Sequence, residues 1–362
     1  MLLVAERLRN QHLLESALRD PADVVARLGA VQAQDYTGAK WALGQRVNDT
    51  TDADVERAFN DGAILRTHVL RPTWHFVTPA DIRWMLALSG PRVIVRSASA
   101  HRELELDHRA FSRSWKILER ALGGGAHLTR VELRAALTRA GISAAGVRLG
   151  HLLMRAELEG LICSGPRQGK HATYAWLERR VPPATPLSRD ESLARLARAY
   201  FSSHGPATER DYVWWSGLTV GDARAGMAMI RADLDRMTLD GLTCWSMPSP
   251  ASRSRARLRS GHVHLLPIYD EYLIAYKDRV HVTGAAPSRA AGKRDDVFSH
   301  YLMVDGQLAG TWSRTLTTRS VVVDLHPYAA LKGASVRMAA SAVERYGRFL
   351  RLDLRCRIEG SP

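Results

Sequence analysis

One supersecondary outline occurs twice in the sequence, and this repeat restricts the fold more than any other feature. In the first copy, Thr129 and Glu132 form a capping box before an apolar-periodic helix that ends near Gly141, and a second helix ends at Gly160. The runs LIC and TYAWL then flank a Gly/Pro turn, SGPRQGKHA, which predicts a hairpin. Helix, helix and hairpin predict a winged helix that binds DNA, or a winged helix used only for packing.

The second copy follows a proline-rich linker at 181–188. Its helices are expected at 189–203, from Thr208 and from Thr219, and a strand is expected at 241–247. The N-terminal third shows short helices and a strand pair, and it could hold a third, more decorated unit. We therefore expect an α+β, mainly helical chain with domains at 1–122, 123–186 and 187–362, the last with a C-terminal β-rich extension.

The net charge points to a polyanionic partner. The chain has 51 Lys plus Arg against 37 Asp plus Glu, a formal charge of +14, and nucleic acid is the first partner to consider. Arginine far exceeds lysine, which suits bidentate contact with phosphate or guanine, although a GC-rich genome explains this bias equally well.

Two basic segments are candidates for contact with DNA. The first, residues 253–259, has four alternating arginines, which would all lie on one face if the segment is extended. Such a row of cations favours a hairpin or loop that contacts DNA, and a solvated surface loop is the alternative. The other is the turn of the predicted hairpin. The residues are Arg253, Arg255, Arg257 and Arg259 in the first segment, and Arg167 and Lys170 in the second.

Several classes of protein are disfavoured. No apolar run approaches the length of a membrane span, and charges at Glu6, Arg7 and Arg9 interrupt any signal peptide, so we expect a cytoplasmic protein. The cysteines Cys163, Cys244 and Cys356 are far apart and predict buried free thiols without a metal site or disulfides. The motifs GxxxxGK[ST], GxSxG, HExxH and GxGxxG are missing, which disfavours nucleotide hydrolysis, serine esterase and zinc protease activity.

Two amides and a carboxylate form the main candidate site. Gln32 and Gln34 in GAVQAQDY stand at the expected end of a short helix, where residues two apart point in nearly opposite directions. Spacing alone therefore favours two exposed or cap-bonding amides. The adjacent Asp35 is a plausible charge stabiliser.

Histidines and a second carboxylate pair are further candidates. His68 and His75 lie on an expected hairpin with two arginines, where functional and structural roles are equally plausible. Asp270 and Glu271 could pair for acid–base chemistry, but a salt-bridge network with nearby Lys277 and Arg279 is favoured.

Five segments resemble the AlkZ-like DNA glycosylases, a superfamily that includes the YcaQ branch. They are AVQAQ (30–34), LRPTWHFVTPADIRW (70–84), GPATERDYVWWSGLT (205–219), LLPIYDEYLIAYKDR (265–279) and VDGQLAGTW (304–312). The resemblance implies three tandem winged-helix units in a C-shaped architecture whose basic concave face binds duplex DNA. It also implies that Gln32 and Gln34 are the catalytic Gln-apolar-Gln motif, nearer the AlkZ branch because YcaQ-like members carry Asp at the second polar position.

The resemblance further implies removal of bulky alkylated purines, a DNA-contacting β-hairpin, which we place at 253–259, and for some members self-resistance to a genotoxic product. An N7-alkylated purine is already cationic, so the enzyme has to stabilise an oxocarbenium-like sugar and place a water. Gln32 and Gln34 can orient that water but cannot take up its proton, with Asp35 or His75 as electrostatic support.

We therefore expect a monofunctional, monomeric glycosylase that acts on N7-alkylated purines in duplex DNA without a cofactor or metal, with bulky or crosslinked adducts among the candidate substrates. It would be cytoplasmic and associated with the nucleoid when bound to DNA. A lyase would need an amine nucleophile, for which Lys40 is nearest in sequence. The alternatives are a non-catalytic winged-helix regulator, which would explain the charge but not the glutamines, and an inactive family member.

Overall fold

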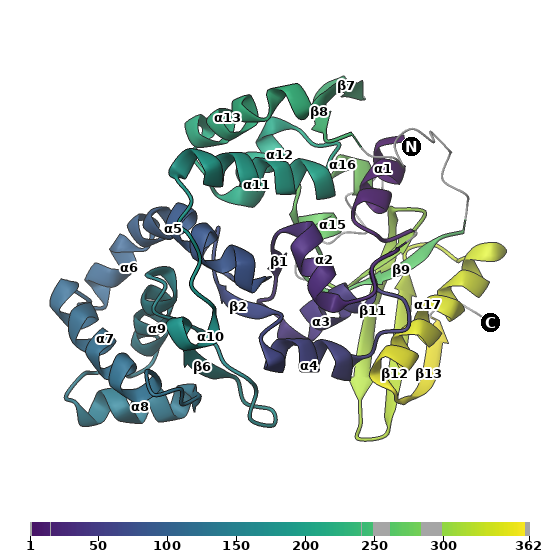
Figure 1. The fold of residues 1–362 in the computed structure, drawn as a ribbon. Helices are drawn as coiled ribbons and strands as arrows, with labels where there is room; N and C mark the ends of the chain where they lie inside the picture. The colour runs from purple at the N-terminus through teal and green to yellow at the C-terminus, as the bar shows by residue number, and fades with distance from the viewer. Residues whose placement is uncertain (1, 15, 240, 249–260, 284–298, 359–362) are drawn as a thin grey trace.

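The computed structural model describes residues 2–14, 16–239, 241–248, 261–283 and 299–358, and it is a mixed α+β protein, about half helical (Figure 1). One order of elements and one strand pairing occur three times. The first repeat consists of α2 (Pro21–Leu28), β1 (Val31–Gln32), α3 (Tyr36–Gly44), α4 (Asp52–Asp61), β2 (Leu65–His68) and β3 (Trp74–Val77). Its strands lie in the order β1-β3-β2, so the first strand pairs with the last.

The second and third repeats follow the same plan. The second consists of α7 (His108–Leu122), β4 (Leu128–Thr129), α8 (Arg130–Arg139), α9 (Arg148–Leu158), β5 (Ile162–Ser164) and β6 (Thr173–Trp176), with strand order β4-β6-β5. The third consists of α11 (Arg189–Ser203), α12 (Glu209–Ser216), α13 (Val220–Met229), β7 (Asp235–Leu239) and β8 (Leu242–Ser246). Here a single bridge between Ala207 and Trp245 takes the place of the first strand.

One core crosses the domain boundary that we expected after residue 122. Leu118 and Leu122 of α7 are fully buried in a cluster with Leu133 of α8 and Leu152 of α9. The glycines that follow α7 therefore form a turn inside the second repeat and not a linker before it. Two helices, α5 (Pro79–Arg96) and α6 (Ala98–Glu103), connect this repeat to the first.

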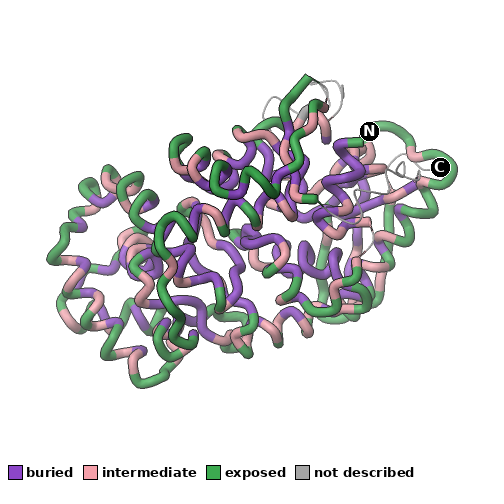
Figure 2. Tube along the Cα trace, turned by 45° about the horizontal axis from the view of Figure 1, so that its top comes forward, coloured by how far each residue is buried: buried purple, intermediate pink, exposed green. Residues whose placement is uncertain are grey.

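The C-terminal extension is a five-stranded sheet with the order β13-β12-β11-β10-β9. Its elements are β9 (Val263–Leu266), β10 (Tyr301–Val304), β11 (Gln307–Leu316), β12 (Ser320–Pro327), α17 (Ala334–Leu350) and β13 (Asp353–Ile358). The helix α17 lies between β12 and β13 in the chain, and these two strands pair in parallel. α17 packs against β9 and α3, and buried residues of the first repeat and of this sheet form one core (Figure 2).

Short segments complete the chain. They are α1 (Leu2–Asn10), α10 (Leu177–Arg180), the 3-10 turn η1 (Arg231–Asp233), α15 (Glu271–Ile274) and α16 (Val280–Thr283). Among the described residues no helix combines the length and the apolar composition needed to cross a membrane. Cys163 and Cys244 are buried free thiols as predicted, but the prediction is wrong for Cys356, which is exposed on β13 at the edge of the sheet.

Candidate active site

Gln32 and Gln34 lie at the end of β1, on the edge of the first sheet. Gly29 ends α2 with a φ of 79°, so the chain is already extended at Gln32, which pairs with His75 of β3. The prediction that this segment ends a helix is therefore wrong. On an extended backbone, side chains two residues apart point to the same side, which lets both amides meet one neighbouring segment.

That segment is the turn between β2 and β3. Arg71 Nη2 donates to Gln32 Oε1 over 3.0 Å, and the backbone N–H of Trp74 donates to Gln34 Oε1 over 3.3 Å. Gln32 is 8% exposed and Gln34 is exposed. Because an amide oxygen has two lone pairs, each glutamine retains an acceptor position for a further hydrogen bond.

Arg71 is held on several sides. Besides Gln32, its guanidinium lies 3.5 Å from His75 Nε2, and its Nη1 donates to the carbonyl of Trp214 over 3.4 Å. Leu70, directly before it, has a φ of 63°, a conformation that is rare for a bulky residue and that is often found near functional sites. Burial lowers the pKa of Arg71 from its ordinary value. Because that ordinary value is very high, the guanidinium is still charged at neutral pH.

His75 is fully buried and uncharged. Its Nδ1 donates to the carbonyl of Thr73 over 2.9 Å, which leaves the Nε2 lone pair facing Arg71. Burial, and then the charge of Arg71, lower the pKa of His75 to about 3. His75 therefore carries no charge at this position and can act there only through hydrogen bonds.

A buried carboxylate lies behind β1. Glu271 is fully buried; its Oε1 accepts the backbone N–H of Gln32 over 2.9 Å and its Oε2 accepts the indole N–H of Trp215 over 2.9 Å. Its Oε2 also lies 3.5 Å from His204 Nε2. Burial acts to raise the pKa of Glu271, but the interaction with His204, the bond from Gln32 and the charge of Arg71 outweigh it and lower the pKa.

The other candidates have partners of their own. Asp35 directly precedes α3, but its side chain makes no capping hydrogen bond. Burial is the main cause that raises the pKa of Tyr269 in the C-terminal part, and the negative charge of Asp35 is the second cause. His68 pairs with Glu157 of α9, a contact that joins the first two repeats. Asp270 pairs with Arg46 over 2.8 and 2.9 Å, so the network that we expected around Asp270 exists but its cation is Arg46 and not Lys277.

The predicted cations have different surroundings. Arg167 is ion-paired with Glu56 of α4 and its side chain is 18% exposed, so it offers less to a phosphate than the sequence suggested. Lys170 is exposed at the turn of the β5–β6 hairpin, which confirms the predicted hairpin. Lys40, the candidate amine, is buried and paired with Asp52 and Glu56, each over 2.8 Å. Residues 253–259, with their four arginines, lie outside the described residues.

An exposed aromatic beside Arg71 was missed at the sequence level. Trp214 is 39% exposed, its indole donates to the carbonyl of Ile274, and the ammonium of Lys277 lies 4.5 Å from its ring centre. Adjacent residues on a helix point about 100° apart. The pair Trp214-Trp215 on an amphipathic helix was therefore a usable signal, since one ring enters the core and the other reaches the surface.

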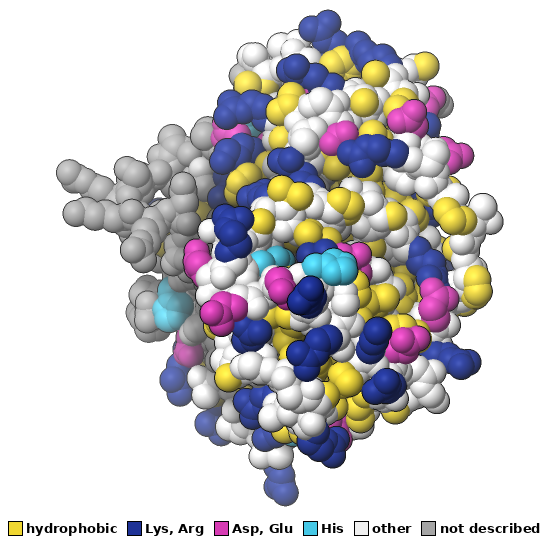
Figure 3. Space-filling model, turned by 90° about the vertical axis from the view of Figure 1, so that its left-hand side faces the viewer, with side chains coloured by type: hydrophobic (Ala, Val, Ile, Leu, Met, Phe, Trp, Pro, Cys, Tyr) yellow, Lys and Arg dark blue, Asp and Glu magenta, His cyan; other side chains and the backbone are white. Residues whose placement is uncertain are grey.

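Basic side chains cover much of one side of the molecule. Figure 3 shows Lys and Arg distributed over the whole of that face, with Asp and Glu interspersed among them. Such a distribution gives a broadly positive surface instead of a single basic patch. It agrees with the net charge of +14 and suits a polyanion that contacts several elements.

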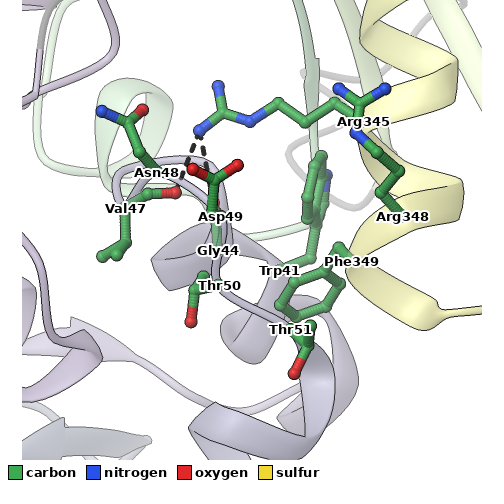
Figure 4. Close-up of a pocket in the computed structure, with 10 residues that line it drawn as sticks. All are labelled: Trp41, Gly44, Val47, Asn48, Asp49, Thr50, Thr51, Arg345, Arg348 and Phe349. Atoms are coloured by element: carbon green, nitrogen blue, oxygen red, sulfur yellow. Dashed lines mark hydrogen bonds between the residues drawn. The ribbon is translucent and has the colours of Figure 1, made fainter.

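A pocket of about 410 Å³ lies between α17 and the loop that follows α3 (Figure 4). Arg345 donates there to the carbonyls of Gly44, Gln45 and Val47, which fixes the loop. Neither glutamine lines the pocket. Within the described residues, no group of three or more His, Cys, Asp or Glu is arranged to hold a metal ion.

Comparison with known proteins identifies relatives over almost the whole chain. The family model described as "DNA glycosylase AlkZ-like" matches residues 25–349. A curated protein of Streptomyces sahachiroi, an interstrand DNA cross-link repair glycosylase, is 25% identical over 379 residues, covering 97% of each chain. The solved structure of the Streptomyces sahachiroi DNA glycosylase AlkZ superimposes with a TM-score of 0.81 at 23% identity, covering 99% of this chain and 98% of the other, and shows the same fold.

Proposed function

This chain belongs to the AlkZ-like DNA glycosylase family, and from that premise we propose that it hydrolyses the N-glycosidic bond of N7-alkylated purines in duplex DNA. The observation that carries the proposal is that Gln32 and Gln34 both face the Arg71 turn. Two amides beside one guanidinium, with a buried carboxylate behind them, can hold a water while the cationic purine takes up the bonding electrons and leaves as a neutral base. This membership in a family of enzymes also favours catalysis over the role of a regulator.

The three structural repeats support an interpretation as tandem winged-helix units in a C-shaped DNA-binding architecture. Each has a helix, a short strand, two helices and a two-stranded hairpin, and the short strand or bridge pairs with the last strand. Hairpins of this kind can contact the DNA backbone while a neighbouring helix approaches a groove. Lys170, at the exposed turn of the second hairpin, is the described cation best placed for such a contact.

The reaction follows from the charge of the substrate. Breakage of the bond between C1′ and N9 moves its electron pair to the alkylated purine, which leaves as a neutral base, and positive charge develops on the deoxyribose. The oxygen of a water then bonds to C1′ and its proton passes to solvent, so no strong base is required. The free lone pairs of Gln32 Oε1 and Gln34 Oε1 can accept hydrogen bonds from that water and orient it.

The surroundings of Lys40 support simple hydrolysis. A lyase needs an amine that can reach the deoxyribose, whereas the Lys40 amine is buried and paired with two carboxylates. Its ordinary function is to connect α3 with α4. The proposed enzyme is therefore monofunctional.

The substrate can include bulky or crosslinked adducts. The relative from Streptomyces sahachiroi is named for repair of interstrand crosslinks, and the exposed side chain of Gln34 suits a lesion that a closed pocket could not enclose. Such an activity would serve DNA repair or self-resistance to a genotoxic product. We expect a monomer that works in the cytoplasm at the nucleoid.

Two segments are candidates for the hairpin that the family resemblance implies. The arginines at 253–259 remain one proposal, although they lie outside the described residues. The β11–β12 hairpin is the other: it extends from the sheet in Figure 1, its turn carries Arg319, and Leu316 beside the turn is 47% exposed. A cation with an exposed apolar residue suits contact with both backbone and bases.

The direct test incubates the purified protein with a duplex that contains one N7-methylguanine and measures the free modified base. Release above the spontaneous rate, and its loss in the Gln32→Ala/Gln34→Ala double variant, is the expected result. Undiminished release by the double variant would remove the role proposed for the glutamines. Binding to undamaged DNA without any release would instead support a non-catalytic protein.

A further inference from the structure

Gln32 is on a strand that few backbone bonds hold in place. β1 spans only Val31 and Gln32, and it lies at the edge of its sheet, where only β3 pairs with it. In an antiparallel pair, successive N–H groups point alternately toward and away from the partner strand. The N–H of Ala33 donates to the carbonyl of Trp74 on the β3 side, so the N–H of Gln32 points to the open edge.

Glu271 occupies that open edge. Its Oε1 accepts the Gln32 N–H over 2.9 Å, and this bond joins residues 239 positions apart in the sequence. Tyr269 nearby has a φ of 65°, which is rare for a bulky residue and turns the chain so that Asp270 and Glu271 both enter the interior. The two charged residues that hydrogen-bond to Gln32, Arg71 and Glu271, thus both stand one or two positions after a residue in the left-handed region.

The charge of Glu271 complements that of Arg71. A guanidinium beside Gln32 would by itself oppose both a cationic purine and a positively charged sugar, because like charges in a partly buried site repel strongly. Glu271 carries the opposite charge on the other side of the same residue, and each of the two groups acts on the pKa of the other. The remaining titratable groups that face Glu271 are His204, His75, Tyr200 and Tyr276.

We propose that Glu271 is a positioning residue for base excision, which fixes Gln32 through its backbone and supplies the negative charge that offsets Arg71 as positive charge develops on the deoxyribose. This inference rests on the function proposed above. Glu271 acts through Gln32 and through the local electrostatic potential, with no contact to substrate. The indole N–H of Trp215 donates to its second oxygen and so fixes its orientation, and His204 Nε2 lies 3.5 Å from the same oxygen.

The neighbouring Asp270 provides a matched control. Both carboxylates are fully buried and adjacent in sequence, but Asp270 pairs with Arg46, whose other partners are Gln11 and the carbonyl of Ala42. Removal of its charge disturbs a buried ion pair without a direct effect on Gln32. The two substitutions therefore separate a general loss of stability from an effect on the site.

The experiment compares Glu271→Gln, Glu271→Asp and Asp270→Asn in release of 7-methylguanine, with rates normalised to the folded fraction. Glu271→Gln should lower kcat at least about tenfold with KM changed less than about twofold. Glu271→Asp, which keeps the charge, should recover part of the rate. Asp270→Asn should lose stability but keep the kcat of the folded protein.

Hydrogen exchange of the Gln32 amide gives a second readout that does not depend on enzymatic activity. In the wild-type protein this amide should exchange much more slowly than an open-edge N–H, and Glu271→Gln should accelerate it. Rapid exchange in the wild type, or an unchanged kcat in Glu271→Gln, would overturn the inference. If wild-type protein releases no base while the amide is protected, the proposed function fails and the structural role of Glu271 remains.

Discussion

The guanidinium of Arg71 donates to the side-chain oxygen of Gln32 over 3.0 Å, and this single bond determines which way the catalytic candidate points. Because the oxygen of the amide faces Arg71, its Nε2 donors face the other way. Arg71 also reaches the carbonyl of Trp214 on α12, so the orientation of Gln32 depends on the contact between the first and third repeats.

Substitution of Arg71 should therefore lower the rate of the chemical step as well as the affinity for DNA. Arg71→Lys keeps a positive charge but cannot hold Gln32 and Trp214 together, since an ammonium lacks the planar fork. We expect kcat for release of 7-methylguanine to fall about tenfold in Arg71→Lys, with a smaller change in KM. Single-turnover kinetics separate the two effects, and a variant that changes KM alone would argue for phosphate binding only.

The two glutamines should contribute unequally. Gln32 is nearly buried and held by a charged donor, whereas Gln34 is exposed and accepts one longer bond. Gln32→Ala should lower kcat about 100-fold and Gln34→Ala by a smaller factor. The reason is that Gln32 is already held in place by Arg71, so it loses less conformational freedom than Gln34 when it orients the water. Both rates come from release of free base, with circular dichroism as a check on folding, and a larger loss in Gln34→Ala would reverse this ranking.

Two exposed lysines should act through phosphate binding. Lys170→Ala and Lys277→Ala should each weaken binding to duplex DNA and reduce the slope of log affinity against log salt by about 1. Lys332→Ala, an exposed lysine in the loop before α17, is the control and should leave the slope unchanged. Fluorescence anisotropy over a salt series gives all three slopes, and equal slopes for the three variants would contradict the assignment.

Lys40 should be dispensable for chemistry but not for stability. Lys40→Met removes the cation that joins Asp52 and Glu56, so the free energy of unfolding should fall by about 1 to 3 kcal/mol because two half-buried carboxylates lose their partner. The folded protein should still release base, and borohydride should trap no covalent adduct with DNA in the wild type. An adduct that disappears in Lys40→Met would instead indicate lyase chemistry.

The sequence predicted the fold better than it predicted the site. The capping box at Thr129 and the turn that contains Lys170 mark local structure, and both are present. The sequence could not place β1, because a two-residue strand has no periodicity and depends on pairing with β3. The helix expected there made the glutamines diverge, whereas the strand brings them to one turn.

Long-range contacts explain the remaining differences. Glu271 meets Gln32 across 239 positions, and no local pattern distinguishes it from Asp270, which pairs with Arg46. Arg167 looked like a free cation, but Glu56, more than 100 positions earlier, neutralises it. Sequence identifies residues that can do chemistry, while packing decides which of them meet.

Buried histidines should make the protein sensitive to mild acid. Burial lowers the pKa of His75 to about 3 in the folded state, against 6.5 when exposed, so between these values the unfolded chain binds a proton that the folded protein excludes. Stability therefore falls as the pH decreases from 6.5, and His75 alone should account for about 2 kcal/mol between pH 7 and pH 5. Burial lowers the pKa of His264 to about 4 and adds to the effect with the same sign.

The contribution of His75 can be isolated in this pH window. The lowered pKa of Glu271 also gives stability that acid removes, but only below its ordinary value of 4.5, so carboxylates contribute little between pH 7 and pH 5. His75→Asn, whose amide can still donate to the Thr73 carbonyl, should reduce the loss of unfolding free energy over this range by about 2 kcal/mol. His171→Asn, at an exposed histidine, should leave it unchanged. Urea unfolding at the two pH values measures each difference, and an equal loss in wild type and His75→Asn would show that His75 is protonated in the folded protein.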